Sequence, residues 1–97
     1  MDHFGALALL EAKQGKEQEV ADFLQSARPL VLQEVGTSTW FAFQTGPSSF
    51  GIFDTFADED GRSAHLTGEV AKALFAKAED LFAGEPQIRM ADILAMK

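Results

Sequence analysis

Asp54 and His65 are the residues of this sequence best suited to acid–base chemistry. Asp54 lies in the apolar run "FGIFDTF", residues 50–56, where weak solvation would make a carboxylate a better base. His65 follows in "GRSAHL", residues 61–66, and an imidazole changes its charge near neutral pH. Together they could remove a proton from a molecule bound in an apolar space. The structural alternatives are that Asp54 accepts a hydrogen bond from a serine, arginine or indole, and that His65 bonds a nearby carbonyl and fixes its helix.

The predicted pocket lies between the helix that carries His65 and one face of the sheet. Alternation along a strand turns Ile52 and Phe56 to the same side as Asp54. Trp40 joins them if residue 45 pairs with residue 49 in a hairpin, whereas a shift of one residue would replace it by Phe41. Each of these apolar residues could equally be plain core. The substrate-binding candidates are Trp40, Ile52, Phe56 and Arg62, the last as a guanidinium that could hold a phenolate.

The elements that must position these residues alternate between strands and helices. Apolar runs bounded by turn residues predict strands, and apolar residues spaced by three and four predict helices. Pro29 should bend or restart the first helix, Gly36 should end it by taking a positive φ, and Asp58 should cap the second helical segment. The predicted strands are 5–12, 38–45, 49–56 and 87–96; the predicted helices run from 16 to about 34, from 59 to 66 and from 69 to 82.

The order β-α-β-β-α-β predicts a ferredoxin-like α+β fold in one domain, residues 1–97. Right-handed crossovers would place both helical segments on one face of a four-stranded antiparallel sheet. The other face would then carry Phe41, Phe43 and Phe53 with no helix to cover it. We expect a homodimer in which two sheets pack face to face, because such an aromatic face is costly to leave in water. The alternative is that loops and the C-terminal tail cover it.

Composition excludes several classes of partner and site. The chain has 97 residues, no cysteine and a formal net charge of −7. A negative charge without a basic cluster argues against nucleic acid and an anionic membrane surface as partners. No apolar stretch reaches the ~18 residues needed to span a bilayer, so we expect a cytoplasmic protein. With no thiolate and only two histidines, no bound metal or haem is expected.

The sequence also resembles a known family. The run "FDTFADEDGRSAHLTGEVAKALFAKAEDLFAGEPQIRMADIL" resembles the second half of the antibiotic biosynthesis monooxygenase family, which are dimeric α+β barrel proteins. "LEAKQGKEQEVADFL" and "EVGTSTWFAF" resemble its first strand, helix and second strand. The resemblance implies a cofactor-free monooxygenase that oxidises an electron-rich aromatic such as a quinol or anthrone. It places His65 at the family's helix histidine and Asp54 at a position often held by an acid or glutamine.

The sequence departs from the family pattern at a strand end and at two positions of the haem-degrading branch. Phe56 stands where the family usually has a tryptophan. In the haem-degrading branch the iron-binding histidine would fall near Phe75 and a strand asparagine near Ala8, so the resemblance argues against haem degradation here.

Two hypotheses of another kind stay open beside the enzyme. One is a non-catalytic dimer whose pocket binds a small hydrophobic molecule for sensing or protection. The other is an accessory domain with a filled core.

Overall fold

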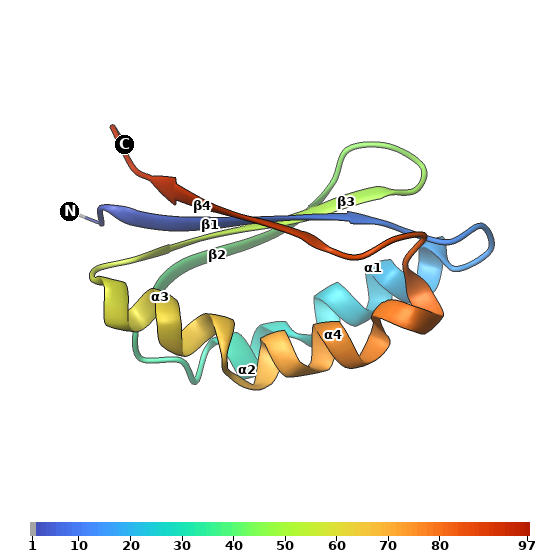
Figure 1. The fold of residues 1–97 in the computed structure, drawn as a ribbon, viewed down its shortest axis with the longest axis horizontal. Coiled ribbons are helices and arrows are strands. Elements are labelled where there is room, and N and C mark those ends of the chain that lie inside the picture. The colour runs from blue at the N-terminus through green and yellow to red at the C-terminus, as the bar shows by residue number, and fades with distance from the viewer. Residues whose placement is uncertain (1) are drawn as a thin grey trace.

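A four-stranded antiparallel sheet forms one layer of the protein, and all four helices cover the same face of it (Figure 1). The computed structural model describes residues 2–97. The strands are β1 (Phe4–Glu11), β2 (Thr37–Gln44), β3 (Ser49–Phe56) and β4 (Gln87–Asp92), in the spatial order β2-β3-β1-β4. The predicted ferredoxin-like α+β fold is therefore confirmed.

The helices follow the predicted breaks. They are α1 (Glu17–Ser26), α2 (Arg28–Val31), α3 (Glu59–Leu66) and α4 (Glu69–Leu81). Pro29 lies in the first turn of α2, where its missing N–H costs nothing, so the chain restarts as a second helix. The carboxylate of Asp58 accepts a hydrogen bond from the backbone N–H of Gly61 at 2.8 Å and caps α3 as predicted.

Two predicted details are wrong. β4 ends at Asp92 and not at residue 96, because Asp92 pairs with Phe4, the first residue of β1, and the partner strand begins there. Gly36 was expected to take a positive φ at the helix end, but Gly15 is the only residue with positive φ among residues 2–97. The first helical segment already ends at Val31, and Gly36 instead lies where the segment before β2 approaches Gly61 of α3.

The hairpin register decides which aromatic side chains face the helices. The backbone N–H of Thr45 donates to the carbonyl of Ser49 at 2.9 Å, and Trp40 lies directly opposite Asp54. This is the register that brings Trp40, and not Phe41, to the side of Asp54. Trp40 packs against the core, whereas Phe41 is 59% exposed on the opposite face.

The core fills the space between the sheet and the helices. Its buried side chains come from alternate positions of β1 and β3 and from the inward stripes of α1 and α4. They include Ala8, Leu10, Val20, Leu24, Phe50, Ile52, Leu74 and Leu81. Within residues 2–97, no helix is long and apolar enough to cross a membrane.

Candidate active site

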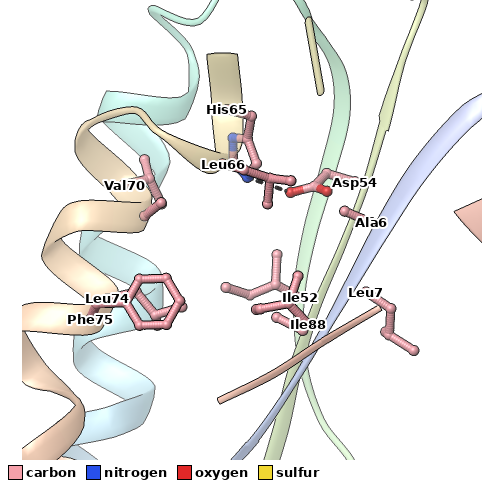
Figure 2. Close-up of a pocket in the computed structure, with 12 residues that line it drawn as sticks. Ala6, Leu7, Ile52, Asp54, His65, Leu66, Val70, Leu74, Phe75 and Ile88 are labelled. Carbon is pink, nitrogen blue, oxygen red and sulfur yellow. Dashed lines mark ion pairs between the residues drawn. The ribbon is translucent and has the colours of Figure 1, made fainter. Parts of the chain in front are cut away.

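His65 is held between two carboxylates. Its Nε2 lies 2.7 Å from Asp54 Oδ2, and its Nδ1 lies 2.5 Å from Glu34 Oε1. Figure 2 shows the contact between α3 and β3 that joins His65 to Asp54. The side chains of His65 and Asp54 are 8% and 2% exposed, and that of Glu34 is 19% exposed. The structure therefore brings the two predicted catalytic residues together and adds a third.

Glu34 reaches His65 because the segment before β2 lies directly on α3. A Cβ placed on Gly36 would lie 2.7 Å from Gly61 Cα, and one on Gly61 would lie 2.7 Å from the Gly36 carbonyl oxygen. Only two glycines allow the backbones to approach so closely. The hydroxyl of Thr37 then donates to Glu34 Oε1 at 2.8 Å and helps fix the carboxylate.

The two carboxylates favour the charged form of His65. Burial acts to lower the pKa of His65, but the hydrogen bonds and negative charges of Asp54 and Glu34 outweigh it and raise this pKa above its usual 6.5. A charged imidazole donates from both nitrogens, so each carboxylate accepts one of its N–H groups. Both nitrogens of His65 are then occupied.

One oxygen of Asp54 is left without a partner. Asp54 Oδ1 and Trp40 Nε1 are buried and make no hydrogen bond with the described residues. An unpaired buried polar atom is costly, and such atoms often have a functional reason. Asp54 thus has one oxygen held by His65 and a second oxygen free to accept a proton.

An apolar cavity adjoins this pair. It lies between α3 and α4 on one side and β1, β3 and β4 on the other, and all of its lining side chains except Asp54 and His65 are apolar (Figure 2). Its volume is about 40 Å³. Since one water needs roughly 10–15 Å³ on this measure, the cavity holds only about three waters. A substrate with an aromatic ring requires it to widen.

The other predicted site residues occupy different places. Ile52 lines the cavity. Phe56 is fully buried and packs on the His65 ring, with centroids 5.4 Å apart. Trp40 lines a separate hollow beside α2. Arg62 bonds the carbonyls of Gly5 and Ala91 and lies 5.1 Å from the Phe4 ring, so its guanidinium is engaged at the end of the sheet.

Glu34 is the site residue that the sequence analysis missed. It lies 31 residues before His65, in a segment without apolar periodicity. Its only local signal is the nearby Gly36, and a glycine at that position indicates a helix end. Phe75 and Ala8, the positions compared with the haem-binding residues, both line the cavity. Among residues 2–97, no group of three or more His, Cys, Asp or Glu side chains is arranged to hold a metal ion.

Solved structures share this fold over almost the whole chain. A "putative antibiotic biosynthesis monooxygenase" from Nitrosomonas europaea has a TM-score of 0.84 at 13% identity, covering 95% of this chain and 99% of that one. Another so named, from Caulobacter crescentus, has a TM-score of 0.81 at 20% identity, covering 97% and 92%. The fold is thus that of the antibiotic biosynthesis monooxygenases, as the resemblance implied.

A nearer relative shows the family. The NE2512 protein of unknown function from Nitrosomonas europaea is 50% identical, with a TM-score of 0.98, and the match covers 100% of this chain and 94% of that chain. The present chain belongs to the same family as NE2512. No protein-family model matches the sequence, and no curated protein matches it.

Proposed function

We propose that this protein is a monooxygenase that oxidises a small electron-rich aromatic, of the quinol or anthrone type, with dioxygen and without a cofactor. The observation that carries the proposal is Asp54 Oδ1, a buried carboxylate oxygen with no partner, on a residue that lines an apolar cavity. The fold relatives named as monooxygenases support the reaction class.

The proposed reaction needs only a base and an apolar cavity from the protein. A phenolic hydroxyl or an activated methylene that gives its proton to Asp54 becomes an electron-rich anion, which can transfer electrons to dioxygen itself. Apolar walls exclude water, so the reactive anion is not quenched by solvent protons. His65 holds Oδ2 of Asp54 and so orients the carboxylate, while Oδ1 stays free to accept the proton.

Opening of the cavity would make room for the substrate. Phe75 of α4 lines both the cavity and an outer groove of about 570 Å³, and its side chain is 53% exposed. A half-exposed ring is weakly held, so a change in its rotamer joins the two spaces at low cost. The joined space would be in the range of roughly 300–1,000 Å³ that small-molecule sites occupy.

The site would operate in a homodimer. The sheet face turned away from the helices carries Leu7, Leu9, Phe41, Phe43 and Phe53, and no helix covers it (Figure 1). A second copy packed sheet to sheet would remove these side chains from water.

Oxygen consumption against a panel of hydroquinones and anthrones tests the proposed reaction. Asp54→Asn keeps the shape of the side chain but removes the base, so turnover should fall by roughly 10²-fold. Asp80→Asn, at an exposed position of α4, is the matched control and should leave turnover unchanged. Equal turnover in native protein and in Asp54→Asn would overturn the assignment.

A non-catalytic dimer that binds a small hydrophobic molecule is the second candidate. The almost wholly apolar lining of the cavity favours it. Saturable binding of a quinol or anthrone without oxygen consumption, equal in native protein and Asp54→Asn, would identify this function.

A further inference from the structure

The imidazole of His65 separates the inner cavity from a hollow on the outer surface. On the inner side it lines the cavity together with Asp54. On the outer side it lines, together with Glu34, a hollow of about 380 Å³ between α3 and the segment before β2. The two carboxylates thus lie on opposite sides of one ring, one of them buried and the other partly exposed.

We infer that Asp54, His65 and Glu34 form a proton path between the cavity and solvent, in which uptake of a proton at Asp54 is matched by release of another through Glu34. This inference rests on the proposed function, since it takes Asp54 as the group that accepts the substrate's proton.

The protons balance as follows. At rest Asp54 and Glu34 are carboxylates and His65 is an imidazolium, so the three groups together carry one negative charge. The substrate's proton moves to Asp54 Oδ1 and makes that side chain neutral. His65 then passes its Nδ1 proton to Glu34, which gives it to water. His65 stays neutral and keeps its Nε2 proton, and the total charge returns to its resting value.

Electrostatics drives the second step. The negative charge of Asp54 is one of the causes that raise the pKa of His65 above 6.5. When Asp54 becomes neutral this support disappears, while burial still disfavours the imidazolium. The remaining negative charge near the ring is that of Glu34, at the other nitrogen. The proton therefore leaves on the Glu34 side.

One carboxylate oxygen of Glu34 is available to pass the proton to water. Its Oε1 accepts hydrogen bonds from His65 Nδ1 and Thr37 Oγ1, whereas Oε2 accepts none from residues 2–97. Glu69, from the start of α4, lines the same hollow, but within residues 2–97 its ion pair is with Lys72 and not with His65. Glu34 is therefore a proton-release residue that acts through His65, and Glu69 offers a matched control.

The first test measures the charge of His65 by ¹⁵N NMR of its ring in protein without substrate. Asp54→Asn imitates the neutral, protonated Asp54. In this variant the pKa of His65 should fall below its native value, and Nδ1 should lose its proton near neutral pH. If His65 has the same pKa in Asp54→Asn as in native protein, the proposed coupling between the two residues is wrong.

The second test measures how fast the His65 ring protons exchange with water, and it needs neither Asp54→Asn nor turnover. An amide cannot carry a proton onward, so Glu34→Gln should slow the exchange roughly tenfold, which corresponds to about 1.4 kcal/mol of barrier. Glu69→Gln should exchange at the native rate. Equal rates in Glu34→Gln and Glu69→Gln would overturn the path.

Neither result depends on oxidation. If no quinol or anthrone is turned over but both NMR results hold, the proton path stands and the proposed reaction fails. If turnover depends on Asp54 but Glu34→Gln exchanges at the native rate, the reaction stands and the path fails.

Discussion

Asp54 and His65 differ in which of their atoms are free to react. In the charged form that its raised pKa favours, His65 donates from both nitrogens, to Asp54 on one side and to Glu34 on the other. It therefore has no lone pair available to take a substrate proton at rest. Asp54 lines the cavity and keeps Oδ1 without a hydrogen-bond partner among the described residues. In the proposed reaction Asp54 therefore accepts the proton and His65 orients Asp54, two roles that the residue types alone left equivalent.

The raised pKa of His65 predicts how stability depends on pH. Its stabilising contribution is fully present below the unfolded pKa of 6.5 and is lost as pH rises through the raised folded pKa. Between these two values the free energy of unfolding should fall by at most about 1.4 kcal/mol per pH unit. Urea unfolding of native protein and of His65→Gln checks this, because the two proteins differ only at residue 65.

In that comparison His65→Gln should be less stable than native protein at pH 6. The difference between their free energies of unfolding should decrease at higher pH. If this difference in free energy of unfolding increases as pH rises, His65 is not charged in the folded protein.

At the scale of elements, the contact between the segment before β2 and α3 positions Glu34. Gly61 lies inside α3, where replacement by alanine would ordinarily favour the helix by roughly 0.8–1 kcal/mol. Here the added Cβ would lie 2.7 Å from the Gly36 carbonyl oxygen, which is backbone and cannot move aside cheaply.

Gly61→Ala should therefore destabilise the protein, by about 1–3 kcal/mol, contrary to helix propensity. Gly84→Ala is the control, since nothing lies within 4 Å of a Cβ there. Urea unfolding measures both variants. Stabilisation of Gly61→Ala would show that the two backbones are free to separate.

The half-exposed ring of Phe75 on α4 predicts an effect on ligand binding. Phe75→Ala should join the cavity to the outer groove and so strengthen binding of a bicyclic probe such as 1-naphthol, followed by Trp40 fluorescence. Since Phe75 is 53% exposed, the loss of stability should be small. Leu74→Ala, at a position 5% exposed, should instead cost about 2–5 kcal/mol. Unchanged or weaker binding by Phe75→Ala would show that this ring does not close the site.

At the scale of the whole molecule, one face of the sheet decides the expected assembly. Phe41 is 59% exposed on the face without helices, and the Phe43 ring covers Gly51 on the same face. Phe41→Asp is the cleaner variant, because replacing Phe43 would also uncover Gly51. It would place an unpaired charge in the proposed interface and should dissociate the dimer.

Sedimentation at micromolar concentration measures the assembly state. Leu32→Asp, at a 66% exposed position just after α2 on the helical side, is the control and should remain dimeric. A native protein that sediments as a monomer would contradict the proposed dimer.

Local patterns in the sequence determined the elements and much of their order in space. Structure is present where the apolar run "GALALLEA", the proline at position 29 and the capping Asp58 predict it. These features depend on neighbours in the chain, and neighbouring residues can be read from a single sequence.

Only the tertiary structure decided how the site is completed. Glu34 meets His65 because two glycines, Gly36 and Gly61, let separate segments touch, and no local pattern encodes that approach. The same packing turned Arg62 toward the sheet end and reduced the cavity to about 40 Å³. Contacts between residues far apart in the chain depend on how whole layers pack, and side-chain periodicity describes only which face each residue offers to that packing.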